Sequence, residues 1–364
     1  MQDFIKQTKV VLNIPPTREQ PRNSEGDFIR LNDGRIMFAY SQYSGGVDDH
    51  APCNIAAVFL SYNGDEVVGG PKILVKASEH FVKNIMSVTL LRMKNGDLGL
   101  FYLVKNNDAT SSYVLRRSAD EGQTFGEPVF CLPDKFAGYY VVNNCRVLRT
   151  RDGRLYVPAA LHRSAVNDEK VTINEGYGVC HLFYSDDDGI SWQEHDTHFV
   201  IDTTDTKTGL QEPDIIELSS GVLKMYFRTD RMYQYECYSH DNGRHWTKPE
   251  ASCFTSPNSP MKISQNPYDG SYFAVWNPIP QYIGREADDE GFFNGGRTPL
   301  VIAKSNDGIN FDKPIELEND PNRGYCYPAV FFVDKNTILL SYCSGGFEDL
   351  KSCLTKTTIR KIVI

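Results

Sequence analysis

The most regular pattern along the chain is a tight turn that runs directly into a strand of apolar and aromatic residues. Each copy has Gly or Asn in the turn, beside Asp, Asn, Ser or Lys, and a second apolar stretch precedes it. The six copies are LNDGRIMFAY from Leu31, MKNGDLGLFY from Met93, TRDGRLYVPA from Thr150, LSSGVLKMYF from Leu218, PYDGSYFAVW from Pro267 and VDKNTILLSY from Val333. A turn of this composition between two apolar stretches is the signal of a β-hairpin, so each copy predicts two paired strands.

A second phrase, a serine followed by acidic or amide residues and a glycine, recurs about every sixty residues, which is typical of a repeat architecture. Its copies are SYNGDEV from Ser61, SADEGQTF from Ser118, SDDDGISW from Ser185, SHDNGRHW from Ser239 and SNDGINF from Ser305. An EF-hand reading of SDDDGISW fails, because Gly189 at the glycine position puts Tyr184 where an acidic ligand is required. The phrase lies between strands, and we interpret it as a turn whose aspartate accepts backbone N–H groups.

Strands follow one another along the chain, and no stretch has sustained helical periodicity. This pattern predicts an all-β fold, a six-bladed β-propeller of four-stranded antiparallel blades, with residues 1–364 as a single domain. There are five serine-aspartate phrases for six units. We therefore expect one blade to be closed by strands from both chain ends, TKVVLNI from Thr8 and TTIRKIVI from Thr357.

The composition of the chain excludes some classes of binding partner and indicates a cellular compartment. A net charge of −9 without a run of Lys or Arg argues against nucleic acid and anionic membranes as partners. The chain has no apolar run long enough for a signal peptide or a membrane span, and its nine cysteines show no CxxC spacing. We expect a cytoplasmic protein with reduced thiols and without metal or cofactor, unless an export signal has been trimmed. The sequence indicates no oligomeric state.

Topology predicts where functional residues gather. In a four-stranded blade the first strands begin at the central channel, on the face opposite the serine-aspartate turns. Counting nine residues back from each hairpin glycine, or its equivalent, selects Glu25, Ser87, Asn144, Glu212, Met261 and Tyr327. Polar side chains in such a ring are costly to bury without a purpose, so this ring is the predicted site. The ends of second strands and the loops that follow them add Asp48, Asp49, His50, Arg228 and Arg297.

These residues carry a resemblance to the sialidase family. The serine-aspartate phrases are similar to Asp-box (BNR) repeats, and LQEPDIIELSSGVLKMYFRTD looks like the sialidase segment with a glutamate ahead of a strand, a glycine turn and an arginine. GGRTPLVIAKSNDGINF resembles the stretch that carries a later arginine ahead of an Asp box. YCYPAVFFVDKNTILLSY resembles the segment that begins with the nucleophilic tyrosine. The resemblance extends over essentially the whole chain.

The resemblance implies a retaining exo-glycoside hydrolase that acts on a terminal, sialic-acid-like sugar of a glycan. Tyr327 would be the nucleophile, Glu212 its base partner, and Asp49 (or Asp48) the acid/base. Arg228 and Arg297 would be two of the three arginines that bind the substrate carboxylate.

The third arginine is where the chain departs from the family. Glu25 occupies the register in which sialidases have an arginine, and Arg30 and Arg35 lie outside that register. Arg146, from the neighbouring unit, is the expected substitute. The complete set of expected substrate-binding residues is Arg228, Arg297, Glu25, Asp48, His50, Asn144 and Arg146.

The implied chemistry is physically consistent. A carboxylate nucleophile would be repelled by a carboxylate on the anomeric carbon, whereas a neutral tyrosine beside a base would not. Arginine binds a carboxylate through two parallel hydrogen bonds, which lysine cannot do. Tyr325, two residues from Tyr327 on the same strand face, is a rival nucleophile. Two other functions stay open: a hydrolase or lyase for a different sugar, favoured by Glu25, and a non-catalytic carbohydrate-binding or scaffold propeller.

Overall fold

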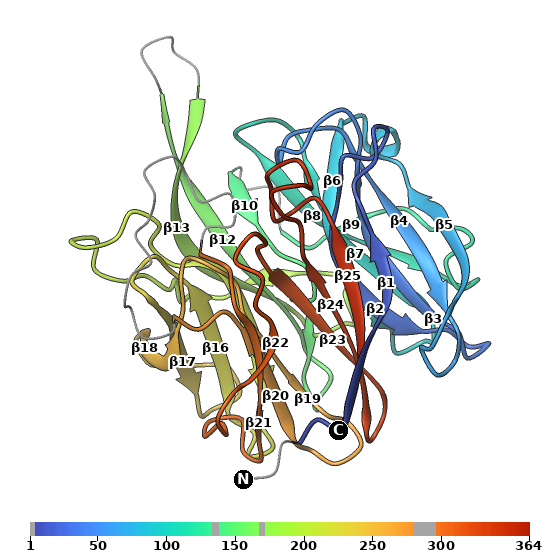
Figure 1. Cartoon of the computed structure of the whole chain (residues 1–364). Coiled ribbons are helices and arrows are strands. Elements are labelled where there is room, and N and C mark those ends of the chain that lie inside the picture. Colours follow the sequence, from blue (N-terminus) through green and yellow to red (C-terminus); the bar gives the residue numbers. More distant parts are fainter. Residues whose placement is uncertain (1–3, 133–137, 167–171, 280–295) are drawn as a thin grey trace.

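The computed structural model of the chain describes residues 4–132, 138–166, 172–279 and 296–364. Within these ranges the chain forms β-strands and one short 3₁₀ helix, η1 (Ala77–His80). Figure 1 shows the strands packed as neighbouring sheets. The first described residues lie beside the end of the chain, where the Lys6 amide donates to the Val363 carbonyl at 2.8 Å. No helix in these ranges is long and apolar enough to span a bilayer.

The described strands form five hydrogen-bonded sheets, of which four follow a path of four strands. The first consists of β1 (Gln7–Ile14), β25 (Thr357–Val363), β24 (Thr337–Cys343) and β23 (Cys326–Asp334). The second consists of β10 (Tyr139–Val141), β12 (Leu155–Val166), β13 (Thr172–Ser185) and β14 (Gln193–Glu194), with β11 (Leu148–Arg149) paired to β12. The third consists of β15 (Gln211–Glu217), β16 (Leu223–Arg228), β17 (Tyr233–Ser239) and β18 (Glu250–Thr255). The fourth consists of β19 (Lys262–Gln265), β20 (Tyr272–Trp276), β21 (Leu300–Ser305) and β22 (Ile315–Glu318).

The fifth sheet has eight strands, in which two antiparallel meanders are joined at a single residue pair. Its strands are β2 (Arg22–Arg30), β3 (Ile36–Tyr43), β4 (Cys53–Leu60), β5 (Val67–Val75), β6 (Asn84–Arg92), β7 (Leu98–Lys105), β8 (Ser111–Ser118) and β9 (Val129–Phe130). The join is a parallel pairing of β4 with β6 at Cys53 and Asn84. It is reinforced by the Asn84 side-chain amide, which donates to the Ala51 carbonyl at 2.6 Å.

The all-β prediction is confirmed, but the prediction of six four-stranded blades is wrong. The described residues form four sheets with a four-strand path and one eight-stranded sheet, because the pairing at Cys53 and Asn84 merges the strands of residues 22–75 with those of residues 84–130. Turn and strand periodicity predicts where strands occur. It contains no information on which neighbouring units share backbone hydrogen bonds across their edges.

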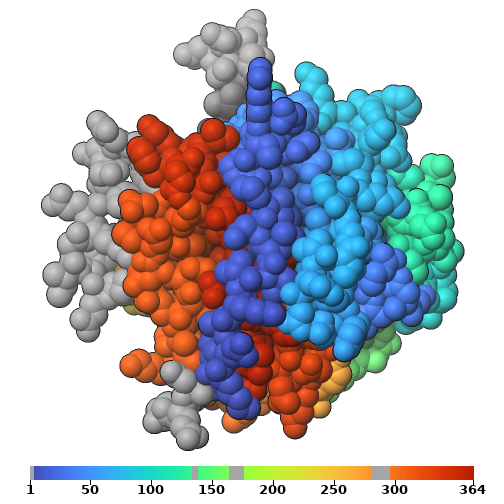
Figure 2. Space-filling view, turned by 45° about the vertical axis from the view of Figure 1, so that its right-hand side comes forward, coloured from blue at the N-terminus to red at the C-terminus, as the bar shows by residue number. Residues whose placement is uncertain are grey.

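The expected pairing of the two chain ends is confirmed. β1 lies antiparallel to β25, in a register that runs from Gln7 opposite Val363 to Ile14 opposite Thr357. Figure 2 shows the N-terminal residues, in dark blue, crossing this face beside the red C-terminal residues. A buried apolar cluster that includes Phe38, Leu339 and Ile359 packs this sheet against the eight-stranded sheet, so both chain ends contribute to the core.

The serine-aspartate phrases form turns between strands, as predicted. In SDDDGISW the Ser185 hydroxyl accepts from the Gly189 amide at 2.8 Å, and Asp187 Oδ1 accepts from the Ile190 and Ser191 amides at 3.1 and 2.9 Å. The other two carboxylates of this phrase pair with arginines: Asp186 with Arg154 and Asp188 with Arg149, both at 2.6 Å. The acidic run therefore has a structural role: two of its carboxylates pair with arginines, and the third accepts the backbone amides of the turn.

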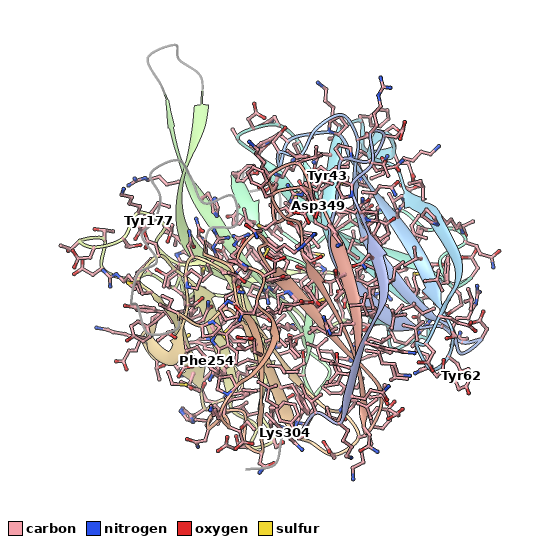
Figure 3. All side chains as sticks on the ribbon, viewed as in Figure 1. Tyr43, Tyr62, Tyr177, Phe254, Lys304 and Asp349 are labelled. Atoms are coloured by element: carbon pink, nitrogen blue, oxygen red, sulfur yellow. The ribbon has the colours of Figure 1, made fainter. Side chains whose placement is uncertain are left out.

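These turns lie at the ends of the strands remote from Tyr43. Figure 3 labels Tyr62 and Lys304, each adjacent to the first serine of such a turn, in the lower part of the view, and Tyr43 in the upper part. Tyr43 ends β3, whose other end, Ile36, pairs with Leu60 immediately before the Ser61 turn. The upper end is where the polar residues of the predicted site gather.

Candidate functional site

Four first strands carry a β-bulge at the position that the register count selected. In each of β2, β6, β15 and β23, the strand has one residue more than its paired strand over a short stretch. The extra residue lies between Ser24 and Asp27, between Met86 and Thr89, between Gln211 and Asp214, and between Cys326 and Ala329, respectively. The bulge residues Glu25, Ser87, Glu212 and Tyr327 all have left-handed backbones, with φ of 56°, 62°, 43° and 53°. Non-glycine residues pay about 1–3 kcal/mol for such conformations, which cluster at functional sites. Bulges of this kind redirect a side chain out of the strand's normal alternation.

The strand geometry beside Glu25 explains the residue that follows it. A Cβ atom at Gly26 would lie 2.5 Å from the Ala39 carbonyl oxygen of the paired strand. Real Cβ atoms do not approach a carbonyl oxygen so closely, so a glycine at position 26 lets β2 bulge while it stays paired with β3.

The four bulge residues line one cavity of about 460 Å³. Arg228, at the end of β16, and Arg297, shortly before β21, line the same cavity, as do Asp49 and His50 from the loop after β3. All eight of these residues are among those that the sequence pattern predicts for the site. The cavity is large enough to hold a single sugar residue with its substituents.

Tyr327 and Glu212 meet inside this cavity. The Tyr327 hydroxyl donates to Glu212 Oε1 at 2.9 Å, and both side chains are buried. Burial, together with the charge of Glu212, raises the pKa of Tyr327 well above its ordinary value. Burial alone would also raise the pKa of Glu212, but the guanidinium groups of Arg228 and Arg297 hold that pKa below its ordinary value. The phenol is therefore protonated and its neighbour ionised, which is the ground state of a tyrosine with a base in contact.

Two arginines flank this pair and are held by a residue that the sequence analysis did not identify. Arg228 Nη1 lies 2.7 Å from Glu212 Oε1, and Arg297 lies over the Tyr327 ring at 5.4 Å from its centroid. Asn258 contacts both: its Oδ1 accepts from Arg228 Nε at 2.5 Å and its carbonyl from Arg297 Nη2 at 3.4 Å. Asn258 thus fixes the separation of the two guanidinium groups.

A third arginine, Arg22, contacts Glu25 and Asp49, two residues that line the cavity. Its guanidinium donates to Glu25 at 3.0 Å, to Asp49 at 2.6 Å and to the Val47 carbonyl at 3.0 Å, and it stacks 4.3 Å from the Tyr43 ring centroid. Arg22 is 1% exposed, and it does not line the cavity itself. It holds two cavity carboxylates in place rather than facing a ligand.

The pKa values of the two carboxyl groups bound to Arg22 are shifted in opposite directions. Burial raises the pKa of Glu25, although Arg22 opposes this, and the Ser87 hydroxyl donates to its second oxygen at 3.1 Å. For Asp49 the desolvation is outweighed by Arg22 and Lys105, which hold the pKa of that carboxyl well below its ordinary value. One guanidinium therefore links a carboxyl that retains its proton more readily to one that is ionised. Such coupled groups titrate as a pair.

Three expected residues lie elsewhere. Arg146 is buried in an ion pair with Asp214 at 2.5 Å, and Asn144 donates to the Gly26 carbonyl at 2.9 Å beneath the cavity wall. Neither lines the cavity, so their placement gives no support to the expected role in substrate binding. Asp48 turns into its own loop and accepts from the His50 amide at 2.9 Å, which leaves Asp49 as the carboxylate of this loop at the cavity.

Lys105 and Tyr139 are further cavity residues that sequence reasoning missed. The Lys105 ammonium donates to the Asp49 carbonyl at 2.6 Å and lies 5.4 Å from the Tyr139 ring centroid. Lys105 ends a second strand at the same mouth as Arg228, and that shared position is the signal that could have identified it. Tyr139 has no comparable signal, because it lies outside the repeated hairpins.

The chain belongs to the family described as BNR repeat-like domain, whose model matches residues 34–339. Among curated proteins none matches the chain in sequence. The predicted membership of a BNR-repeat family is thus confirmed.

Several solved structures share the fold. A Dyadobacter fermentans protein of unknown function is 16% identical with a TM-score of 0.72, over 99% of this chain and 100% of that one. The NanB sialidase of Streptococcus pneumoniae is 13% identical with a TM-score of 0.70, over 98% of this chain and 70% of that one. Trypanosoma rangeli sialidase, as a covalent intermediate with 2,3-difluorosialic acid, is 13% identical with a TM-score of 0.65, over 94% of this chain and 54% of that one. The fold is that of sialidases.

The paired charges at Arg22 predict a stability effect. Arg22→Gln leaves Glu25 buried without its cation and should lower the free energy of unfolding by about 3–5 kcal/mol at pH 7. Asp49, whose folded-state pKa is lowered, contributes stability above its unfolded pKa of about 3.9 and loses it as the pH falls. Glu25, whose pKa burial raises, takes up its proton first as the pH falls, so the part of the deficit that comes from its unpaired charge should shrink from pH 7 to pH 4. The part that comes from Asp49 should be lost only below about pH 3.9.

Urea unfolding at several pH values measures this deficit. Arg35→Gln is the matched control, because Arg35 forms an exposed ion pair with Asp33 at 2.6 Å and should cost less than about 1 kcal/mol. Equal losses for the two variants, or a deficit that grows toward pH 4, would show that Arg22 does not stabilise the ionised carboxylates.

Proposed function

We propose that the chain is a retaining exo-glycoside hydrolase that removes a terminal, sialic-acid-like acidic sugar from a glycan. The observation that carries the proposal is the 2.9 Å hydrogen bond from Tyr327 to Glu212, in a cavity whose same wall presents Arg228 and Arg297. A buried phenol, its base and two guanidinium groups form a set that a scaffold protein does not need. The family and the fold are consistent with this activity but do not establish it.

In the proposed first step the Tyr327 oxygen attacks the anomeric carbon while Glu212 accepts the phenolic proton. The bond to the departing glycan breaks, and its oxygen takes a proton from the Glu25–Asp49 pair, of which Glu25 is the better proton donor and Asp49 the ionised partner. Water then cleaves the tyrosyl–sugar bond, with the protons returning by the reverse route. The sugar is released with its anomeric configuration retained.

The acidic character of the proposed substrate rests on Arg228 and Arg297. Asn258 holds the two guanidinium groups on one side of Tyr327, within the cavity. A carboxylate on the anomeric carbon would lie beside the attacking oxygen, where two arginines can bind it by charge-assisted hydrogen bonds. A neutral phenol approaches such a carbon without the repulsion that a carboxylate nucleophile would meet.

A hydrolase or lyase for a different sugar is the second candidate function, and Arg22 is the observation that favours it. Arg22 is committed to Glu25, Asp49 and the Val47 carbonyl, and it is 1% exposed. Among the residues that the structure describes, the cavity therefore offers a substrate carboxylate two arginines, and Glu25 lines the same cavity. A sugar that donates hydroxyl groups to Glu25 fits that carboxylate better than an anion does.

Removing the Tyr327 hydroxyl tests the nucleophile. Tyr327→Phe should lower kcat by at least about a thousandfold on an aryl sialoside or whichever aryl glycoside is hydrolysed, while ligand affinity stays nearly unchanged, because the ring remains and the attacking oxygen is lost. Glu212→Gln should act similarly. The matched control is Tyr325→Phe, since Tyr325 is buried two residues away and does not line the cavity. Near-normal turnover by Tyr327→Phe would rule out the tyrosine mechanism.

Conservative replacement of the arginines tests the substrate class. Arg228→Lys and Arg297→Lys should each weaken binding of an acidic sugar by about 1.5–3 kcal/mol, the scale of a charge-assisted hydrogen bond, and should barely affect an uncharged analogue. Titration calorimetry with the charged and neutral sugars measures both. Equal losses for the two sugars would favour the second candidate function.

A further inference from the structure

Outside the cavity, the edge of the second sheet brings two histidines and a glutamate onto one face. β14 pairs with β13 so that Glu194 stands opposite Phe183. Beyond it the chain returns to β13 at Cys180 and Phe199, whose backbones exchange hydrogen bonds of 3.0 and 2.8 Å. In an antiparallel pairing the neighbours of such a pair also lie opposite each other, which places His181 against His198.

The three side chains converge on a point. His181 Nδ1 lies 2.6 Å and His198 Nε2 lies 3.3 Å from the same oxygen, Oε1, of Glu194. The centroids of the two imidazole rings lie 4.3 Å apart. One nitrogen from each histidine and one carboxylate oxygen all lie within 4.8 Å of one another. The His181 and Glu194 side chains are 8% and 12% exposed, whereas that of His198 is 51% exposed, so the group is open on one side.

We propose that His181, Glu194 and His198 bind a divalent first-row transition metal, with Zn²⁺ as the first choice. Two imidazoles and one carboxylate are a common donor set for this ion, and the exposed side beside His198 leaves the fourth position to water. Tetrahedral Zn²⁺ separates its ligand atoms by about 3.3 Å. The 2.6 Å contact between His181 and Glu194 therefore widens by less than an ångström when both bind the metal.

The position of this group on the sheet gives the metal a structural role. β14 has two residues and forms the outer edge of its sheet, so few backbone hydrogen bonds hold it. A metal shared by His181 on β13, Glu194 on β14 and His198 in the following loop would tie these three segments together. None of the three lines the cavity of Tyr327 and Glu212, so the metal is independent of the proposed hydrolysis.

Zinc binding by the full chain, without a histidine tag, tests the proposal. Competition with a chromophoric chelator gives affinity and stoichiometry for the wild type, for His198→Ala and for Glu194→Gln. His245→Ala is the matched control, because His245 also contacts a carboxylate four residues away, Asp241 at 2.6 Å, but is not part of this three-residue group. X-ray absorption at the zinc edge identifies the ligands, and thermal unfolding with and without Zn²⁺ confirms that each variant is folded.

One Zn²⁺ per chain is expected in the wild type and in His245→Ala, with a first shell of nitrogen and oxygen and a higher Tm when zinc is present. Binding should weaken about tenfold or more in His198→Ala and in Glu194→Gln, and should weaken in the wild type as the pH falls and the imidazoles are protonated. The proposal is overturned if the wild type binds zinc no more tightly than His198→Ala, or if the zinc edge shows sulfur ligands. In either case the three residues are a hydrogen-bonded cluster alone.

Discussion

Pairing of buried charge is the constraint on which the rest of the site depends. Arg22 is buried with Glu25, and Arg228 is largely buried with Glu212, while Arg146 and Lys262 share Asp214 below them. Each of these charges would be costly to bury alone, because the protein interior solvates ions poorly. The positions of the ionic groups are therefore set by one another, and the sheets around the cavity must hold them at contact distance. A substrate enters a preformed arrangement of charge and needs to reorganise little of it.

Strained backbone conformations at the bulges set the positions of the side chains that line the cavity. Glu25, Ser87, Glu212 and Tyr327 occupy left-handed conformations at equivalent bulges of four different first strands. Each left-handed conformation costs about 1–3 kcal/mol. It turns the side chain toward the cavity, whereas a regular strand would direct that side chain into the interface between sheets. Recurrence of one strained conformation at four equivalent positions indicates that it is inherited with the repeated unit. The side chain placed there differs from one sheet to the next.

Sequence reasoning located these bulge residues because the hairpin glycine marks a fixed distance along each unit. The count places Glu212 and Tyr327 in one ring, and their hydrogen bond joins residues 115 positions apart in the sequence. The same count missed Arg22, because Arg22 lies three residues ahead of the selected position and its partner Asp49 lies in a loop without a periodic signal. Arg146, the expected substitute for the third arginine, instead pairs in the core with Asp214, a residue distant in the sequence.

The division of the strands into sheets could likewise not be predicted from the sequence. Periodic turns predict how often strands occur, and they did so correctly along most of the chain. The parallel pairing at Cys53 and Asn84, which produces the eight-stranded sheet, arises from contact between the edges of two units. Such contacts depend on the curvature of the assembled sheets, and no local pattern of apolar and polar residues encodes them.

The central claim of this account is that Tyr327 forms a covalent bond with the sugar. A 2,3-difluoro analogue of an acidic sugar tests it, because the second fluorine slows hydrolysis of the intermediate and lets it accumulate. The chain is incubated with the analogue, and intact mass and peptide fragmentation locate the added sugar. The account predicts one adduct per chain, on the hydroxyl of Tyr327, that water slowly removes. An adduct on Glu25, Asp49 or Glu212 would contradict it.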